Sequence, residues 1–470
     1  MRLRSFSVSL RFFACFPMDA SPIPRRTLIL YALPELTQAI VTLPMALFIP
    51  AFYADDLKLP LAGVGVAIAA SRLLDVISDP LIGVLSDRWV TRWGRRKPWV
   101  ASGTPLLMVS AWMVFAPPAA VSLGYLLVWA SLLFLAFTMV DLPHKVWGAE
   151  LSTDYLERNH VAAWREGFGA FGLVLFLSML WLMGMSGHHS AREQLTAIAL
   201  SIVVSLPLLV GIALVKVPEA APERIPGEPL KGRLAWLAVI RNRAFIRTMA
   251  TILLFGAAVM IQATLHKLVL THVVGRPEIF APLILVENIG SIAAIPFWLR
   301  IAAHFGKHRA VTAAALWIGV CSLGLPIVEA GDSVIYSVLI VMRGTSLTSI
   351  FLLSNSIAAD VVDQDIVETG RQRTGLFFAI WGMAVKGAVA LGVLLATVLP
   401  AALGFDPGSG APTPEAKRWL MLIYGWLPCL IMVSAAPLLW NFPIDRRRQR
   451  ELRARIAECR VERQPGRRLS

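Results

Sequence analysis

The chain has 470 residues, of which 57% are hydrophobic and only 16% are charged. The mean hydropathy of +0.66 excludes a water-soluble enzyme, and the low charge excludes a disordered chain. The net charge of +14 predicts no nucleic-acid partner, because the basic residues lie in short loops between apolar runs and in the C-terminal tail. The four cysteines have no paired spacing, so we expect neither a disulfide scaffold nor a thiolate metal site.

Twelve apolar runs follow one another along the chain, and each is long enough for a transmembrane helix of about 20 residues. They cover roughly 28–53, 61–85, 99–118, 122–148, 163–186, 194–216, 245–270, 278–303, 309–328, 333–357, 375–402 and 418–441. The polar insertions between them are too short for a folded soluble domain. The runs therefore predict an all-α membrane protein with twelve transmembrane helices.

The positions of arginine and lysine indicate the orientation in the membrane. These residues cluster in the N-terminal segment, the 2–3 loop, the 6–7 segment, the 8–9 loop and the tail, whereas the 3–4 and 9–10 loops contain none. We therefore expect both termini in the cytoplasm and a multi-pass protein of the cell inner (plasma) membrane. The cytoplasmic N-terminal segment, 1–27, has no good signal-peptide cleavage site, and Met18 is the expected translation start.

A weak internal repeat divides the chain into two halves. Segment 93–96 (WGRR) resembles 305–308 (FGKH) at an offset of 212 residues, and 165–167 resembles 373–375 at an offset of 208. A repeat after six helices has parallel topology and predicts two six-helix bundles around a central cavity. The expected boundaries are an N-terminal bundle at 28–216, a cytoplasmic linker at 217–244, a C-terminal bundle at 245–442 and a basic cytoplasmic tail at 443–470.

Helix 2 carries three ionisable residues on one face. Arg72, Asp75 and Asp79 are spaced i, i+3 and i+7, which places them within about 60° of one another around a helix. Pro80 frees the carbonyl of Val76 from its helical hydrogen bond, so oxygen atoms are concentrated there. Hard cations prefer oxygen ligands, so we expect a cation site, for Na+ or a proton, at Asp75 and Asp79. The alternative is a buried Arg–Asp pair that locks helix 2 to a neighbour, although one arginine cannot neutralise two aspartates.

Helix 4 repeats this spacing with Thr138, Asp141 and Lys145. The carboxylate of Asp141 can accept hydrogen bonds from a polyhydroxylated solute, which favours a solute-binding role. The alternative is that Asp141 and Lys145 satisfy each other as an i,i+4 ion pair.

Other ionisable residues lie within apolar runs and have no partner on their own helix. Arg165 opens helix 5, and Lys386 lies deep in helix 11 among glycines and alanines. A lone lysine there needs a carboxylate or water, so we expect Lys386 to approach the acidic residues of helix 2 or helix 4. Lys267, near the end of helix 7, is expected to snorkel toward the membrane surface. Weaker candidates are Glu287, Asn288 and Arg343.

Charged residues at the ends of the helices predict a gate. The 2–3 loop contains Asp87, Arg88 and Arg92 after Gly83, and these residues are expected to form salt bridges that close the cytoplasmic side in one state. The alternative is that they only set the topology. The second half carries the corresponding gating candidates Asp360, Asp363 and Arg373.

At these residues the chain resembles the glycoside–pentoside–hexuronide:cation symporters of the major facilitator superfamily, of the melibiose-permease type. The helix-2 signature reads RLLDVISDPLIG at 72–83 and is followed by RWGRRKPW at 92–99. The helix-4 segment TMVDLP at 138–143 and the 10–11 segment that leads to Lys386 also fit. The similarity extends from about residue 27 to about residue 442.

This resemblance implies the major facilitator fold and symport of a solute with Na+, Li+ or H+ by alternating access. It places Asp75, Asp79 and Thr138 at the cation site. The residues assigned to substrate binding are Asp141, Arg165, Lys145, Lys386 and Arg72. Two departures weaken a galactoside substrate: Ala39 stands at the position of the helix-1 acidic residue, and Lys145 replaces the aromatic residue that stacks on sugar.

The leading hypothesis is a cation-coupled secondary transporter of a small polar solute, such as a sugar, a glycoside or a sugar acid. We expect no cofactor, no catalytic residue and no metal beyond Na+ at Asp75 and Asp79. The expected partners are the solute, the coupling cation and the lipid bilayer, and the chain is expected to be monomeric. The alternatives are the same fold with a lysolipid or another amphipathic substrate, a polytopic membrane enzyme, and a sensor that binds its solute without transporting it.

Overall fold

The computed structural model describes residues 23–89, 91–151, 155–188, 190–219, 242–328, 331–369, 374–409, 412–443 and 451. Within these ranges, twelve helical spans are long and apolar enough to cross a membrane. This count confirms the prediction made from the apolar runs. Met18, Arg373 and most of the predicted linker and tail lie outside the described residues.

The first six spans form the N-terminal half. They are α1 (Arg25–Ala32) with α2 (Glu35–Leu47), α3 (Ile49–Ala51) and a π-helical turn (Phe52–Asp56), then α4 (Leu61–Arg88), α5 (Lys97–Phe115), α6 (Leu123–Glu150), α7 (Tyr155–Met185) and α8 (Ala191–Lys216).

The last six spans form the C-terminal half. They are α10 (Arg243–Val269) with a π-helical turn (Leu270–Val274), α11 (Phe280–Ala293) with α12 (Ile295–Phe305), α13 (Lys307–Leu323), α14 (Ser333–Gly344) with α15 (Leu347–Thr369), α16 (Thr374–Ala402) and α17 (Pro414–Trp440).

Several spans are broken where the sequence interrupts the helical hydrogen bonds. The first span breaks at Leu33 and Pro34, and the eighth breaks just before Pro296, because proline has no N–H and clashes with the preceding turn. The break at Pro34 begins a new helix at Glu35. A carboxylate in the first turn of a helix is stabilised by the helix dipole, which makes this a favourable place for an acidic residue within a membrane span.

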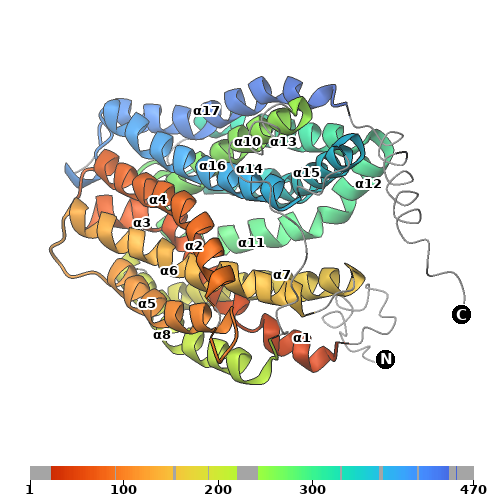
Figure 1. Cartoon of the computed structure of the whole chain (residues 1–470). Helices are drawn as coiled ribbons and strands as arrows, with labels where there is room; N and C mark the ends of the chain where they lie inside the picture. The colour runs from red at the N-terminus through yellow and green to blue at the C-terminus, as the bar shows by residue number, and fades with distance from the viewer. Residues whose placement is uncertain are drawn as a thin grey trace, which may run out of the picture.

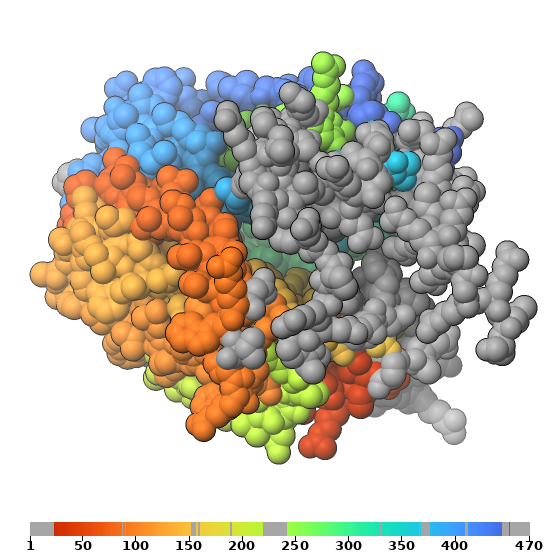
Figure 2. Space-filling model, in the orientation of Figure 1, coloured from red at the N-terminus to blue at the C-terminus, as the bar shows by residue number. Residues whose placement is uncertain are grey.

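The two halves lie one above the other in Figure 1, with the helices running roughly side to side. We call the end where α1 begins and α17 finishes the near end, which is at the right of Figure 1, and the opposite end the far end. The turn Phe52–Asp56 and the start of α17 lie at the far end. In Figure 2 the surface of α4 (orange) meets that of α16 (blue) directly toward the far end.

The apolar cores differ between the two ends. One large core contains Val41 and Phe48 of the N-terminal half together with Leu265 and Phe280 of the C-terminal half. At the near end each half has a core of its own, one around Tyr31 and Trp147 and the other around Phe245 and Phe377. Among the described residues, burial of apolar surface therefore joins the halves at the far end, whereas the near-end cores each belong to one half.

Close packing of α7 on α2 depends on Gly172. A β-carbon at this position would lie 2.3 Å from the carbonyl oxygen of Leu36 and 2.7 Å from its Cα. Backbone atoms cannot move aside as a flexible side chain can, so the two helices would have to separate.

We expect Gly172→Ala to destabilise the protein by about 1–3 kcal/mol, as overpacking of a close-packed interior typically does. Gly167→Ala on the same helix is the control, because a β-carbon there meets nothing within 4 Å and alanine favours helix formation. Thermal unfolding of the purified protein checks both. A Gly172→Ala variant as stable as Gly167→Ala would contradict the packing described here.

Candidate functional site

The charged face of α4 points into the protein. Arg72 and Asp75 are buried, with 9% and 2% of their surface exposed, and Nη1 of Arg72 lies 3.7 Å from Oδ2 of Asp75. The guanidinium of Arg72 also stacks on the ring of Phe134 from α6, at 3.8 Å from the ring centroid. Asp79, one turn further along, keeps 29% of its side chain exposed. The first carboxylate is therefore enclosed, whereas the second is accessible to solvent.

Lys386 comes from α16 of the other half and completes this cluster. Its Nζ lies 2.9 Å from Oδ2 of Asp75 and 2.5 Å from Oδ2 of Asp79. Two positive charges, on Arg72 and Lys386, thus balance the two carboxylates. Charges within a membrane span are tolerated when they are paired in this way, and both pairs made by Lys386 join the two halves of the protein.

Thr138 of α6 adds a hydroxyl to the same group of atoms. Its Oγ1 lies 2.7 Å from Oδ1 of Asp75 and 2.9 Å from Oδ1 of Asp79. A hydroxyl has one hydrogen to donate, so it bonds to one carboxylate at a time. We call Asp75, Asp79, Thr138 and Lys386 the paired-acid site. One oxygen of each carboxylate contacts the ammonium group and the other contacts the hydroxyl, and oxygen ligands of this kind suit a hard cation.

A second charged group lies one turn further along α6. Nζ of Lys145 is 2.6 Å from Oδ2 of Asp141, so these residues form the i,i+4 pair that the sequence offered as the alternative to solute binding. Lys145 keeps 45% of its side chain exposed and Asp141 only 15%. The ammonium group is therefore the more accessible part of this pair.

Arg165 of α7 lies against two acidic residues. Its Nε is 3.4 Å from Oε1 of Glu35 on α2, within ion-pair distance but without the alignment of a hydrogen bond, and its Nη2 contacts Glu166. Glu35 also lies 3.6 Å from Nδ1 of the buried His144.

Sequence reasoning missed Glu35. Ungapped counting from Asp75 led to Ala39 as the position of the helix-1 acidic residue, and Glu35, four residues earlier in the same span, was not considered. A carboxylate directly after Pro34 within an apolar run was the available signal.

Gln38, one turn further along α2, is 2% exposed, and neither polar atom of its amide has a hydrogen-bond partner in the described part of the chain.

The weaker candidates of the C-terminal half pair with each other. Arg343 of α14 donates two hydrogen bonds to Oε1 of Glu287 on α11, at 2.5 and 3.2 Å, and both residues are buried. Asn288 donates to the backbone oxygen of Ile284. The repeat offset of 212 carries Asp75 onto Glu287 and Asp79 onto Ser291. Glu287 thus corresponds to Asp75 and is also paired with an arginine, whereas Asp79 has an uncharged counterpart, Ser291.

The predicted gate residues are spread over the near end. Arg88 and Arg92 are exposed, and Arg92 lies over the ring of Trp93. Asp360 of α15 accepts a hydrogen bond from Lys307 at 2.6 Å, and Asp363 lies one turn further along α15. The side chain of Asp87 and the whole of Arg373 lie outside the described residues.

A network that the sequence did not predict lies beside the 2–3 loop. Glu150 of α6 pairs with Arg95 and Arg96, each at 2.9 Å. Glu219, which follows α8, accepts hydrogen bonds from the backbone N–H groups of Arg95, Arg96 and Lys97. These contacts fasten the start of α5 to the ends of α6 and α8 within the N-terminal half.

Twelve spans in two halves, with a charge-balanced cluster between them, define a membrane transport protein rather than an enzyme. The sequence profile of the MFS/sugar transport protein family matches residues 30–446, and the chain belongs to this family. It is therefore a multi-pass membrane transporter, which confirms the expectation drawn from the helix-2 and helix-4 motifs and rules out the polytopic enzyme.

Curated relatives match over most of their length. The glucuronide carrier protein homolog of Escherichia coli is 22% identical, with 91% of this chain and 94% of that protein covered. The sodium-dependent lysophosphatidylcholine symporter 1 of Gallus gallus is 21% identical, with 89% and 86% covered. The crystal structure of the nucleoside transporter NupG superposes with a TM-score of 0.65 at 14% identity, over 88% of this chain and 99% of that one. This likeness confirms the major facilitator fold.

Removal of one partner from a buried ion pair typically costs about 3–5 kcal/mol. We expect Glu35→Gln to destabilise the protein by an amount near the lower end of this range. The carboxylate is 14% exposed and faces both Arg165 and His144. Glu166→Gln is the control, because Glu166 contacts the same arginine but is 73% exposed, and exposed pairs contribute within about 1 kcal/mol. Thermal unfolding of both variants checks the difference, and equal effects would show that Glu35 has no special role.

Proposed function

We propose that the chain is a cation-coupled secondary transporter that works by alternating access, and that its coupling cation binds at Asp75, Asp79 and Thr138. One observation carries this proposal: the ammonium group of Lys386 lies between the two carboxylates, where a mobile cation would bind. The coupling ions that suit this site are Na+, Li+ and H+. The Gallus gallus relative supports the proposal, because it is named a sodium-dependent symporter.

Charge balance provides the coupling. With Lys386 in place, the four charges of the cluster cancel and no further cation is needed. When a monovalent cation enters, the net charge of the cluster becomes +1, and Lys386 has to leave the carboxylates to restore neutrality. Lys386 and Asp79 are 25% and 29% exposed, so water and ions reach them. Because Lys386 belongs to the C-terminal half, the exchange of one cation for another also breaks a bond between the halves.

The released ammonium of Lys386 offers a partner for the solute, together with Arg165, Lys145 and Asp141. These groups form charged and neutral hydrogen bonds, which suits a small polar solute such as a sugar, a glycoside or a sugar acid. The relative named a glucuronide carrier homolog supports this class.

A second candidate is a lysolipid or another amphipathic solute. The 45% exposure of the Lys145 side chain supports it, because an accessible ammonium suits a phosphate head group. Thermal stabilisation of the purified protein, measured in parallel with glycosides, sugar acids and lysolipids in the presence of Na+, discriminates between the two classes.

We infer that the near end is the open side in this conformation. The shared apolar core closes the far end, so the exposed faces of Asp79, Lys145 and Lys386 are reached from the near end. The arginine-rich loops lie at the near end, and the positive-inside rule assigns that side to the cytoplasm. We therefore propose that the structure represents the inward-open state and that both termini are cytoplasmic.

Asp79→Asn is expected to abolish cation-driven accumulation of the solute while the protein is still made and inserted, because the cluster then carries one carboxylate for two tethered cations. Uptake into vesicles with an imposed Na+ or H+ gradient measures this. The control is Asp332→Asn in an exposed loop at the far end. Undiminished gradient-driven accumulation in Asp79→Asn would exclude the proposed cation site.

Lys386→Met is expected to tighten binding of the coupling cation in the absence of solute by about tenfold or more, which corresponds to about 1.4 kcal/mol. The reason is that the ammonium group of Lys386 no longer competes with the cation, and only the charge of Arg72 still balances the two carboxylates. Calorimetric titration with Na+ measures the affinity, and Lys216→Met, at the exposed end of α8, is the control. A weaker affinity would show that Lys386 supports the cation site instead of competing for it.

A further inference from the structure

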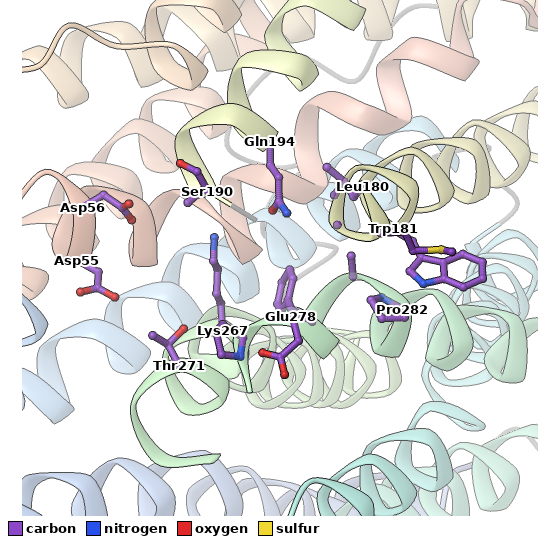
Figure 3. A pocket seen from close by; sticks show the side chains of 16 residues that line it. Asp55, Asp56, Leu180, Trp181, Ser190, Gln194, Lys267, Thr271, Glu278 and Pro282 are labelled. Atoms are coloured by element: carbon purple, nitrogen blue, oxygen red, sulfur yellow. The ribbon is translucent and has the colours of Figure 1, made fainter. Parts of the chain in front are cut away.

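A cavity of about 680 Å³ lies at the far end, between the two halves. The N-terminal half lines it with Asp55 and Asp56 and with the facing ends of α7 and α8, and the C-terminal half lines it with α10 and α11. Figure 3 shows Lys267 of α10 extending between the segments that carry Asp56, Ser190 and Gln194. The sequence predicted that this lysine snorkels toward the membrane surface; in the structure its Nζ is buried.

The ammonium group of Lys267 is buried without a partner. Its Nζ has no hydrogen-bond partner in the described part of the chain. It lies instead 4.8 Å from the ring centroid of Phe48 in the first span and 6.0 Å from that of Phe280 on α11. These two rings, one from each half, contact each other edge to face, with their centroids 5.0 Å apart.

The neighbouring carboxylates do not supply the missing bond. Asp55 lies 3.0 Å from Nε2 of His272, also across the two halves, and Asp56 is exposed. Among the described ion pairs, none with a separation of 4.0 Å or less involves Lys267. Asp55 and Asp56 attract the ammonium only at longer range. The π faces of the two phenylalanines recover part of the lost hydration, but less than a carboxylate contact would.

We propose that Lys267 raises the free energy of the closed far end and thereby keeps that end able to open. When the halves separate at the far end, the Phe48–Phe280 contact parts and water reaches the ammonium, which regains its hydration. The favourable hydration of Lys267 therefore opposes the apolar core that holds the far end closed.

This role rests on alternating access, but it concerns the balance between the two states and not the coupling site. A transporter needs both states to be populated, and a ligand shifts them only by its difference in affinity for the two. Phe48, Phe280 and the residues packed around them form one continuous apolar core across the halves. Without an opposing group, that core would hold the far end closed through the whole cycle.

The test is Lys267→Met, which keeps a long flexible side chain between the two rings and removes the charge. Spin labels at Met185 and Val334 report opening of the far end, because these are exposed residues on α7 of one half and α14 of the other. The four native cysteines are replaced beforehand. We expect the ratio of far-end-open to far-end-closed molecules to fall by about tenfold or more, which corresponds to about 1.4 kcal/mol. We also expect the variant to unfold at a higher temperature.

Lys417→Met is the matched control. Lys417 lies in the first turn of α17, at the far end and outside the cavity, so its loss changes the net charge equally and should leave the ratio unchanged. An unchanged ratio in Lys267→Met would overturn the proposal. A shift toward the open far end would also overturn it, because that result is expected if Asp55 and Asp56 used Lys267 to hold the end closed. Failure of Lys267→Met to fold would overturn it as well.

These distances are measured without solute or gradient, so they are independent of the coupling mechanism. If Asp79→Asn still accumulated solute while Lys267→Met closed the far end, the proposed cation site would fail and the role of Lys267 would stand.

Discussion

The neutrality of the charged cluster between α4 and α16 is the constraint on which the rest of the structure depends. Two carboxylates in a membrane span are tolerable only if two positive charges reach them. Arg72 comes from the same helix, but Lys386 has to come from the other half, so the halves must approach closely at this level. A β-carbon on Gly65 of α4 would collide with the side chain of Thr397 on α16, which shows how close the two helices are. Close packing and charge balance therefore require each other here.

Much of the fold follows from the sequence because its causes are local. Twelve apolar runs become twelve spans since each satisfies its backbone hydrogen bonds within itself. The shared face of Arg72, Asp75 and Asp79 follows from helical periodicity alone. Lys386 was expected near one of two acidic groups because a lone lysine among small residues needs a partner, and helix periodicity could not decide which. The structure places it at the α4 acids, which lie across the interface from α16.

The features that sequence reasoning missed depend on packing between helices. The contact between Glu35 and Arg165 requires a break at Pro34 and a close crossing of α2 and α7, neither of which has a signature in the spacing of charges. Arg343 and Glu287 lie 56 residues apart, and each alone resembled a functional residue. Lys267 sits where a snorkelling lysine would be expected. Only the two rings packed around its ammonium, one from each half, show that it is retained inside.

Lys386 and Lys267 show how the two halves can be held together and still separate. Both lysines belong to the C-terminal half and both reach groups of the N-terminal half. Lys386 meets two carboxylates, so its contact is strong but can be replaced by another cation that enters the same oxygens. Lys267 meets aromatic faces, so its contact is weak and is replaced by water. Under the proposed mechanism, release of the central contact needs a specific ion. The apolar core still has to part at the far end, and hydration of Lys267 offsets only part of that cost. In a transporter that must not open both ends at once, this arrangement would give control of the cycle to the central site.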